Sequence, residues 1–180
     1  MQRIFLIGYM GAGKTTVGKA LSKALGLTFY DLDWYIEGRR HRTIAQLFEQ
    51  EGEEGFRKIE QNMLHEAAEF EDILLSCGGG TPCFFDNIDY MNRQGNVVYL
   101  KASPEVLCKH LRMGRTERPL LKGKNDEELR QFIEEQLRLR EPYYNKARFT
   151  IDVSLMDTYE KINITVEKIK AILSKPPQPI

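Results

Sequence analysis

The residues with the clearest chemistry lie near the amino terminus, where the segment GYMGAGKT at residues 8–15 fits the pattern G-x-x-x-x-G-K-[S/T]. In this pattern the backbone N–H groups of a glycine-rich loop surround the phosphates of a nucleotide. We expect Lys14 to reach the β- and γ-phosphates of the nucleotide and the Thr15 hydroxyl to ligate Mg²⁺. The full set of residues predicted to bind the nucleotide at this loop is Gly11, Ala12, Gly13, Lys14, Thr15 and Thr16.

Two carboxylates, Asp31 and Asp33, follow the next apolar segment. Residues two apart in an extended chain face the same side, so both side chains can point toward the phosphate site. One carboxylate near Mg²⁺, bound through water, is expected of a nucleotide enzyme, and a second can orient or deprotonate an acceptor hydroxyl. An ordinary acidic strand end is the alternative, and the pair alone does not decide between them.

Three consecutive glycines, Gly78, Gly79 and Gly80, follow a third apolar segment. Glycines allow backbone amides to approach a ligand closely, and three of them in a row cost considerable folding entropy. A flexible turn before Pro82 is the alternative, but the entropy cost favours a functional reason for the triplet.

Two arginines lie on or beside the inward faces of predicted helices. Arg140 continues a ridge made by Leu129, Ile133 and Leu137, and Arg57 borders an apolar stripe and has Glu60 within reach one turn later. An unpaired buried charge is costly, so each guanidinium needs a partner. That partner is either an internal carboxylate or an anionic ligand.

A basic stretch over residues 112–124 has no regular period. Such a segment can close over a triphosphate, exclude water and place an arginine on the transferred group. A solvated surface loop and a small nucleic-acid patch are the alternatives. The stretch lacks the aromatic residues on which bases would stack.

The elements that must position these residues alternate between short apolar runs and helical patterns. We predict strands over residues 4–7, 27–32, 73–76, 97–100 and 149–153, and helices over 14–25, 43–51, 54–70, 104–112, 126–141 and 157–174. Such alternation is typical of an α/β domain with a mostly parallel sheet. Ligands then bind beyond the carboxyl ends of the strands, which is where the glycine loop, the two aspartates and the glycine triplet would lie.

Composition narrows the classes of protein further. The chain has 180 residues with 26 basic and 26 acidic side chains, so its net charge of zero argues against a broad grip on nucleic acid. Three cysteines without metal-ligand spacing indicate a reducing compartment. No stretch approaches the roughly 20 apolar residues of a membrane span. We therefore expect a monomeric cytoplasmic protein that ends in a proline-rich tail over residues 175–180.

In the order and spacing of its motifs the chain resembles shikimate kinases. The motifs are GYMGAGKTT, Asp31-Leu32-Asp33, FRKIE at 56–60, CGGG at 77–80, RPLL at 118–121 and LREPYY at 139–144. The resemblance spans residues 1 to about 152. It implies a three-layer α/β/α fold like that of nucleoside monophosphate kinases, with a five-stranded parallel sheet. It further implies one kinase domain over 1–174, with substrate-binding helices over about 34–62 and a mobile lid over about 113–125.

The resemblance also implies a reaction and a substrate site. The γ-phosphoryl group of ATP would pass to the 3-hydroxyl of shikimate, giving shikimate 3-phosphate and ADP on the route to the aromatic amino acids. Asp33 would bind the ring hydroxyls and orient or activate the nucleophile. Arg57, Arg140 and the Gly79 amide would hold the substrate carboxylate, which a planar guanidinium matches with two hydrogen bonds.

On the nucleotide side, the resemblance implies that Arg118 comes down with the lid onto the phosphates and that Arg112 lies along the adenine. Asp31 would hold Mg²⁺ through water, with Thr15 as a direct ligand. Residues 154–158 show no recognisable adenine-contacting pattern, so we assign them no role.

Three other functions are compatible with parts of the sequence. A kinase for another polyol, such as gluconate, would share the glycine loop and the fold. A nucleotide-dependent switch would bind ATP without an acceptor, and a nucleic-acid-processing ATPase would be stimulated by DNA or RNA. The paired arginines and the glycine triplet favour shikimate as the acceptor, and a panel of substrates would decide.

Overall fold

The computed structural model describes residues 1–114 and 123–174. The strands are β1 (Arg3–Ile7), β2 (Thr28–Asp31), β3 (Ile73–Ser76), β4 (Asn96–Lys101) and β5 (Phe149–Asp152). The helices are α1 (Lys14–Leu25), α2 (Leu32–Arg40), α3 (Ile44–Ala68), α4 (Asn87–Gln94), α5 (Pro104–Met113), α6 (Asp126–Tyr144) and α7 (Tyr159–Leu173), and a short 3₁₀ helix, η1, covers Thr81–Cys83.

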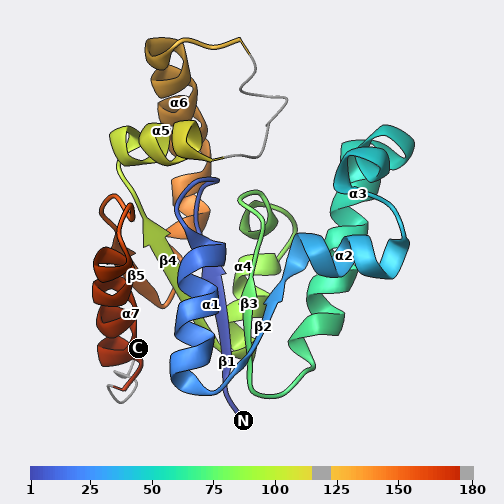
Figure 1. The fold of residues 1–180 in the computed structure, drawn as a ribbon. Coiled ribbons are helices and arrows are strands. Elements are labelled where there is room, and N and C mark those ends of the chain that lie inside the picture. The colour runs from blue at the N-terminus through green and yellow to red at the C-terminus, as the bar shows by residue number, and fades with distance from the viewer. Residues whose placement is uncertain (115–122, 175–180) are drawn as a thin grey trace.

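The five strands form one parallel sheet in the order β2-β3-β1-β4-β5. Strand β1 lies in the centre because the chain leaves it toward β2 and β3 on one side and later toward β4 and β5 on the other. Helices α1 and α7 cover one face, and α3, α4 and the end of α6 cover the other (Figure 1). The expected three-layer α/β/α fold with a five-stranded parallel sheet is confirmed.

Burial of the sheet on both faces explains the apolar runs seen in the sequence. Residues 4–7 of β1 are fully buried, as are 74–75 of β3 and 97–98 of β4. Alternation of polar and apolar side chains is therefore absent from the central strands, as is usual for parallel sheets. Each central strand ends at the same edge of the sheet, so the residues that follow β1 and β3 are brought together.

The helices α2 and α4 and the short helix η1 were not predicted as separate elements, although most of α2 overlaps the segment expected to bind the substrate, residues 34–62. The predicted strand over 27–32 is wrong at its end, because Leu32 already belongs to α2. The Asp31 side chain accepts a hydrogen bond from the backbone N–H of Asp33 (3.1 Å) and so caps this helix. Asp33 therefore lies in a first helical turn, not in extended chain as we expected.

Two helices differ from their predicted bounds for reasons of backbone chemistry. The predicted helices over 43–51 and 54–70 form one helix, α3, with a kink at Gly52, whose φ of 66° and ψ of −178° are not helical. Helix α6 continues to Tyr144, past the predicted end at residue 141, with Pro142 in its last turn. Proline there removes a single hydrogen bond close to the end, and the helix tolerates this loss.

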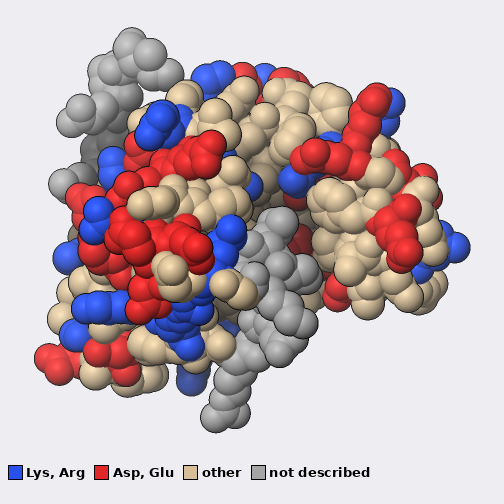
Figure 2. Space-filling view, turned by 90° about the horizontal axis from the view of Figure 1, so that it is seen from above, with Lys and Arg blue, Asp and Glu red and all other residues tan. Residues whose placement is uncertain are grey.

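The surface carries both signs of charge. In Figure 2, which views the molecule from above, groups of Asp and Glu side chains lie beside Lys and Arg side chains. This mixture agrees with the zero net charge of the sequence. Within residues 1–114 and 123–174, no helix is both long enough and apolar enough to cross a lipid bilayer.

Two glycines in helices allow a test of how α1 packs. A Cβ atom at Gly18 would lie 2.5 Å from Cε2 of Phe29, whereas one at Gly38 in α2 would meet nothing within 4 Å. We predict that Gly18→Ala lowers the free energy of unfolding through overpacking, which typically costs about 1–3 kcal/mol. Gly38→Ala should raise it by roughly 0.5–1 kcal/mol, because alanine is the better helix former.

Urea denaturation of both variants checks this prediction. Changes of opposite sign support it. Stabilisation by both alanines would show that α1 does not need a bare backbone against β2.

Candidate active site

A cavity of about 420 Å³ opens at the carboxyl ends of β1, β2 and β3. Figure 1 shows helices projecting beyond this edge of the sheet on both sides: α5 with the far part of α6 on one side, and α2 with the first part of α3 on the other. The cavity is lined by Met10, Gly11, Gly13, Lys14, Thr15, Thr16, Asp31, Asp33, Ser76, Cys77, Gly78, Gly79, His110, Met113, Gly114 and Met156. The glycine loop, both aspartates and part of the glycine triplet therefore border one space, as the sequence predicted.

The glycine loop has the backbone geometry of an anion site. Gly11 and Gly13 have φ values of 84° and 86°, in the left-handed region that favours glycine. Gly13 precedes α1 at the N-cap position, and within the described structure no side chain caps this helix and its first turn holds no acidic residue. The N–H groups and positive dipole end of α1 thus remain available to phosphate.

Lys14 is held inside this loop. Its Nζ donates hydrogen bonds to the carbonyl oxygens of Gly8 (2.8 Å) and Tyr9 (3.0 Å). A cation is therefore already positioned beside the amides that would receive phosphate.

Thr15 and Asp31 form an oxygen-rich pair beside the loop. The Thr15 hydroxyl donates to Oδ2 of Asp31 (3.1 Å). The parts of the chain that the structure describes contain no group of three or more side chains of the kind that hold a metal alone. A hydroxyl and one carboxylate suit Mg²⁺, which usually takes one or two protein oxygens and completes its shell with waters and phosphate oxygens.

Asp33 has a strongly perturbed acidity. Its pKa is raised to about 6, mainly by burial, and further by the negative charges of Asp31 and Glu60, while Lys14 acts in the opposite direction. A carboxylate with a pKa closer to neutrality is a better proton acceptor than an ordinary aspartate.

The glycine triplet is the point at which the predicted substrate residues meet. A Cβ atom at Gly78 would lie 3.3 Å from Oδ1 of Asp33, one at Gly79 would lie 3.2 Å from Nη1 of Arg140, and one at Gly80 would lie 2.6 Å from Nη2 of Arg57. Space explains these glycines, because none of the three has a φ in the left-handed region. The triplet thus lets one carboxylate and two guanidinium groups approach the same short stretch of backbone.

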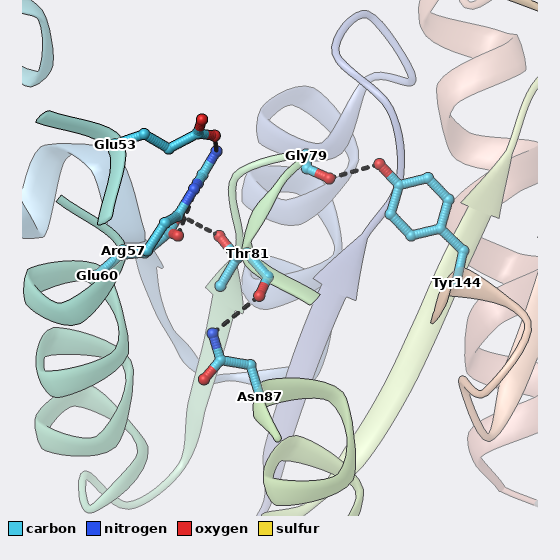
Figure 3. A network of polar contacts seen from close by, with 7 residues as sticks. All are labelled: Glu53, Arg57, Glu60, Gly79, Thr81, Asn87 and Tyr144. Atoms are coloured by element: carbon cyan, nitrogen blue, oxygen red, sulfur yellow. Dashed lines mark hydrogen bonds and ion pairs between the residues drawn. The ribbon is translucent and has the colours of Figure 1, made fainter. Parts of the chain in front are cut away.

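Arg57 is fixed by a buried network (Figure 3). Its Nη1 donates to Oε2 of Glu60 (2.8 Å), which confirms the expected pairing, and the Glu60 carboxylate is only 2% exposed. The other oxygen of Glu60 accepts a hydrogen bond from the Thr81 hydroxyl (2.6 Å), and Asn87 donates to the Thr81 carbonyl oxygen (2.9 Å). The guanidinium also lies over the Phe84 ring, 4.2 Å from its centroid.

Arg140 has a different environment. Its Nη2 donates to Gln136 (3.0 Å), and its guanidinium lies 5.3 Å from the centre of the Tyr9 ring. In the described parts of the chain no carboxylate lies within 4 Å of it. One turn further along α6, the Tyr144 hydroxyl donates to the Gly79 carbonyl oxygen (Figure 3). Since Tyr144 and Arg140 share α6, this bond holds Arg140 against the triplet.

Among the described residues, four that were predicted to bind a substrate do not line this cavity: Ala12, Arg57, Arg112 and Arg140. Arg57 and Arg140 nevertheless lie beside Gly80 and Gly79. Arg112, in the last turn of α5, pairs with Asp126 (2.9 Å) and donates to the Lys124 carbonyl oxygen (2.7 Å). Arg118 lies outside the described residues, together with most of the expected lid and the tail over 175–180.

Sequence reasoning missed His110 and Met156, which both line the cavity. Residues 154–158 showed no sequence pattern that would indicate a binding role. A single histidine on a helix does not indicate one either until its neighbours in space are known. One clue was available: the connection after the last parallel strand must also end at the ligand-binding edge of the sheet.

Comparison with known proteins agrees with the geometry. The family model for shikimate kinase matches residues 10–172. A shikimate kinase of Parabacteroides distasonis is 56% identical over 173 residues, which cover 96% of this chain and 100% of that protein.

Two solved structures extend the comparison to the fold. Shikimate kinase from Bacteroides thetaiotaomicron superimposes with a TM-score of 0.93 at 48% identity, covering 97% of this chain and 99% of that one. Shikimate kinase from Acinetobacter baumannii, in complex with shikimate, gives a TM-score of 0.83 at 34% identity, covering 99% and 96%. The chain belongs to the shikimate kinase family, the ATP-dependent kinases that phosphorylate shikimate in the synthesis of aromatic amino acids.

Proposed function

We propose that the cavity binds both substrates of the family reaction end to end, with the ATP phosphates at the glycine loop and shikimate at the glycine triplet. The single observation that carries this proposal is the convergence of Asp33, Arg57 and Arg140 on Gly78–Gly80, beside the loop that holds Lys14. An acceptor bound at that point would have its carboxylate neutralised by Arg57 and Arg140 and its hydroxyl facing the Asp33 carboxylate.

A coupled assay of ADP release tests the proposal directly. We expect release to depend on shikimate and to be negligible with gluconate or nucleoside monophosphates. Equal release with gluconate, or release that shikimate does not stimulate, would contradict the proposed acceptor.

At the nucleotide end, Lys14 and the amides of Gly11, Gly13, Thr15 and Thr16 would hold the phosphates. The amide of Ala12, also predicted to bind there, already donates to the carbonyl oxygen of Tyr9 (3.1 Å). The uncapped start of α1 supports the phosphate-binding role, because its N–H groups have no competing side-chain acceptor in the described structure. Phosphoryl transfer depends mainly on positioning and charge neutralisation, which these groups supply.

Mg²⁺ fits the donor set beside the loop. Thr15 would ligate it directly and Asp31 would hold it through water. When bound, the ion neutralises charge on the β- and γ-phosphate oxygens.

At the acceptor end, Asp33 would bind the ring hydroxyls of shikimate and orient or deprotonate the 3-hydroxyl. Arg57, Arg140 and the Gly79 amide would hold the shikimate carboxylate, since a planar guanidinium matches a carboxylate with two hydrogen bonds. The roles expected of Arg112 at the adenine and Arg118 at the phosphates stay predictions.

We also infer a monomeric cytoplasmic enzyme that does not act on nucleic acid. The three free cysteines and the mixed charge of the surface in Figure 2 support this inference. Light scattering of the purified protein at micromolar concentration tests the oligomeric state.

Removal of the Lys14 charge should slow transfer. We predict that Lys14→Ala lowers kcat by at least about 100-fold, the usual effect of losing one preorganised electrostatic group. Lys19→Ala, at an exposed lysine of the same helix, is the matched control. A turnover of Lys14→Ala within a few-fold of the unmodified enzyme would contradict the role.

Loss of Arg140 should affect one substrate only. Arg140→Ala should weaken shikimate binding by roughly 30- to 5,000-fold, corresponding to about 2–5 kcal/mol for one partner of a desolvated charge pair. ADP affinity and the melting temperature should change little, because Gln136 is its neutral partner in the protein.

Calorimetric titration of both ligands checks this difference, with exposed Arg138→Ala on the same helix as control. Equal weakening of both ligands would mean that Arg140 has a structural role.

Asp33→Asn should separate catalysis from folding. The pKa of Asp33 in the folded protein, about 6, lies above its ordinary value of 3.8, so the folded state favours the protonated form and the charged form costs stability. This cost is absent below pH 3.8 and grows as the pH rises toward 6. The asparagine variant, which carries no charge, should therefore become the more stable protein above pH 6, by at most about 3 kcal/mol.

Urea denaturation in EDTA between pH 4 and 8 measures this difference, with exposed Glu71→Gln as control. The same Asp33→Asn variant should lose nearly all transfer activity. A stability difference that is constant with pH would contradict the raised pKa of Asp33. An asparagine variant that keeps its activity would contradict the proposed role of Asp33 in transfer.

A further inference from the structure

His110 connects two segments that lie far apart in the sequence. It is in the last turns of α5, which lies next to the glycine loop in Figure 1. Its Nδ1 lies 2.6 Å from the carbonyl oxygen of Gly11, and its Nε2 lies 2.9 Å from the backbone nitrogen of Met156. The histidine therefore bridges the glycine loop and the connection between β5 and α7.

The partners of the ring fix its protonation state. A carbonyl oxygen only accepts, so Nδ1 must carry the proton that is donated to Gly11. A backbone N–H only donates, so Nε2 must be unprotonated to accept from Met156. Both bonds form together only in the neutral ring with its proton on Nδ1.

The bond to Met156 anchors an otherwise irregular connection. Of residues 154–157, only Met156 makes a backbone hydrogen bond to another element in the described structure. Its side chain packs onto the glycine loop, since its Cε would lie 2.0 Å from a Cβ atom at Gly13. Met156 also lines the cavity. The position of the cavity wall formed by Met156 thus depends on His110.

We propose that His110 is a positioning residue for the nucleotide: it holds the glycine loop and the segment 154–158 at a fixed separation, so that both walls of the ATP site are formed before ATP binds. The inference rests on the proposed placement of the ATP phosphates at the glycine loop. The two hydrogen bonds of His110 go to Gly11 and Met156 and not to the glycine triplet or its arginines, so we expect shikimate binding not to depend on it.

Three substitutions separate the two bonds. His110→Leu removes both. His110→Asn keeps a donor near the Nδ1 position for Gly11, and His110→Gln keeps an acceptor near the Nε2 position for Met156. Lys109→Gln, at the exposed neighbouring residue, is the matched control.

We expect His110→Leu to raise the KM for ATP and the Kd for ADP by about 10-fold, in line with the loss of two neutral hydrogen bonds. The kcat at saturating ATP and the KM for shikimate should stay within about twofold, since Lys14, Asp33 and the arginines are untouched. The Asn and Gln variants should lie between His110→Leu and the unmodified enzyme.

An unchanged KM for ATP would overturn the inference, and so would a fall in kcat together with weaker binding of both substrates. If the Leu variant does not fold, the Asn and Gln variants decide by the same comparison. Titration of ADP into Lys14→Ala separates this inference from the placement of ATP. If Lys14→Ala binds ADP with normal affinity, the proposed placement of the ATP phosphates is overturned. If Lys14→Ala binds ADP weakly but the His110 variants bind it normally, only the positioning role of His110 is overturned.

Discussion

The site depends on the glycines at 78–80. Because these residues have no side chains, the side chains of other residues can approach their backbone closely. Asp33, Arg140 and Arg57 each come within van der Waals distance of the position that a Cβ atom would occupy there. These residues belong to three different helices, so their common contact with the triplet sets the distance between the acid and the two guanidinium groups. A Cβ atom at Gly80 would force the Arg57 guanidinium to move, and one at Gly78 or Gly79 would press on Asp33 or Arg140.

Burial of charge beside this triplet is balanced by pairing. Glu60, although almost inaccessible, has one oxygen bound to Arg57 and the other to the Thr81 hydroxyl. A buried carboxylate with both oxygens hydrogen-bonded is tolerated, while an unpaired one would be costly. The same negative charge helps to raise the pKa of Asp33. Glu60 therefore both orients Arg57, the arginine proposed to bind the substrate, and adjusts the acidity of the proposed proton acceptor Asp33.

Local patterns in the sequence predicted much of this arrangement. The glycine loop with its flanking strand and helix, the sheet class, and the pairing of Arg57 with Glu60 all depend on residues close together in the chain. The first turn of α2 was missed because Asp31 acts as a helix cap, a role that cannot be distinguished from a strand end by periodicity. His110 and Met156 were missed because their contact joins residues 46 positions apart. Residues 154–158 carry no repeating pattern that would reveal it.

The central place of β1 has a consequence for how the chain is made. This strand is synthesised before the other four strands of the sheet, yet its neighbours are β3, which starts at Ile73, and β4, which starts at Asn96. Its backbone N–H and C=O groups cannot all be satisfied by the sheet until β4 has been synthesised. Pairings of such long separation form slowly, because a large loop must close first. During translation, a strand whose residues 4–7 are fully buried in the folded protein is therefore exposed and has to be kept from associating with other chains.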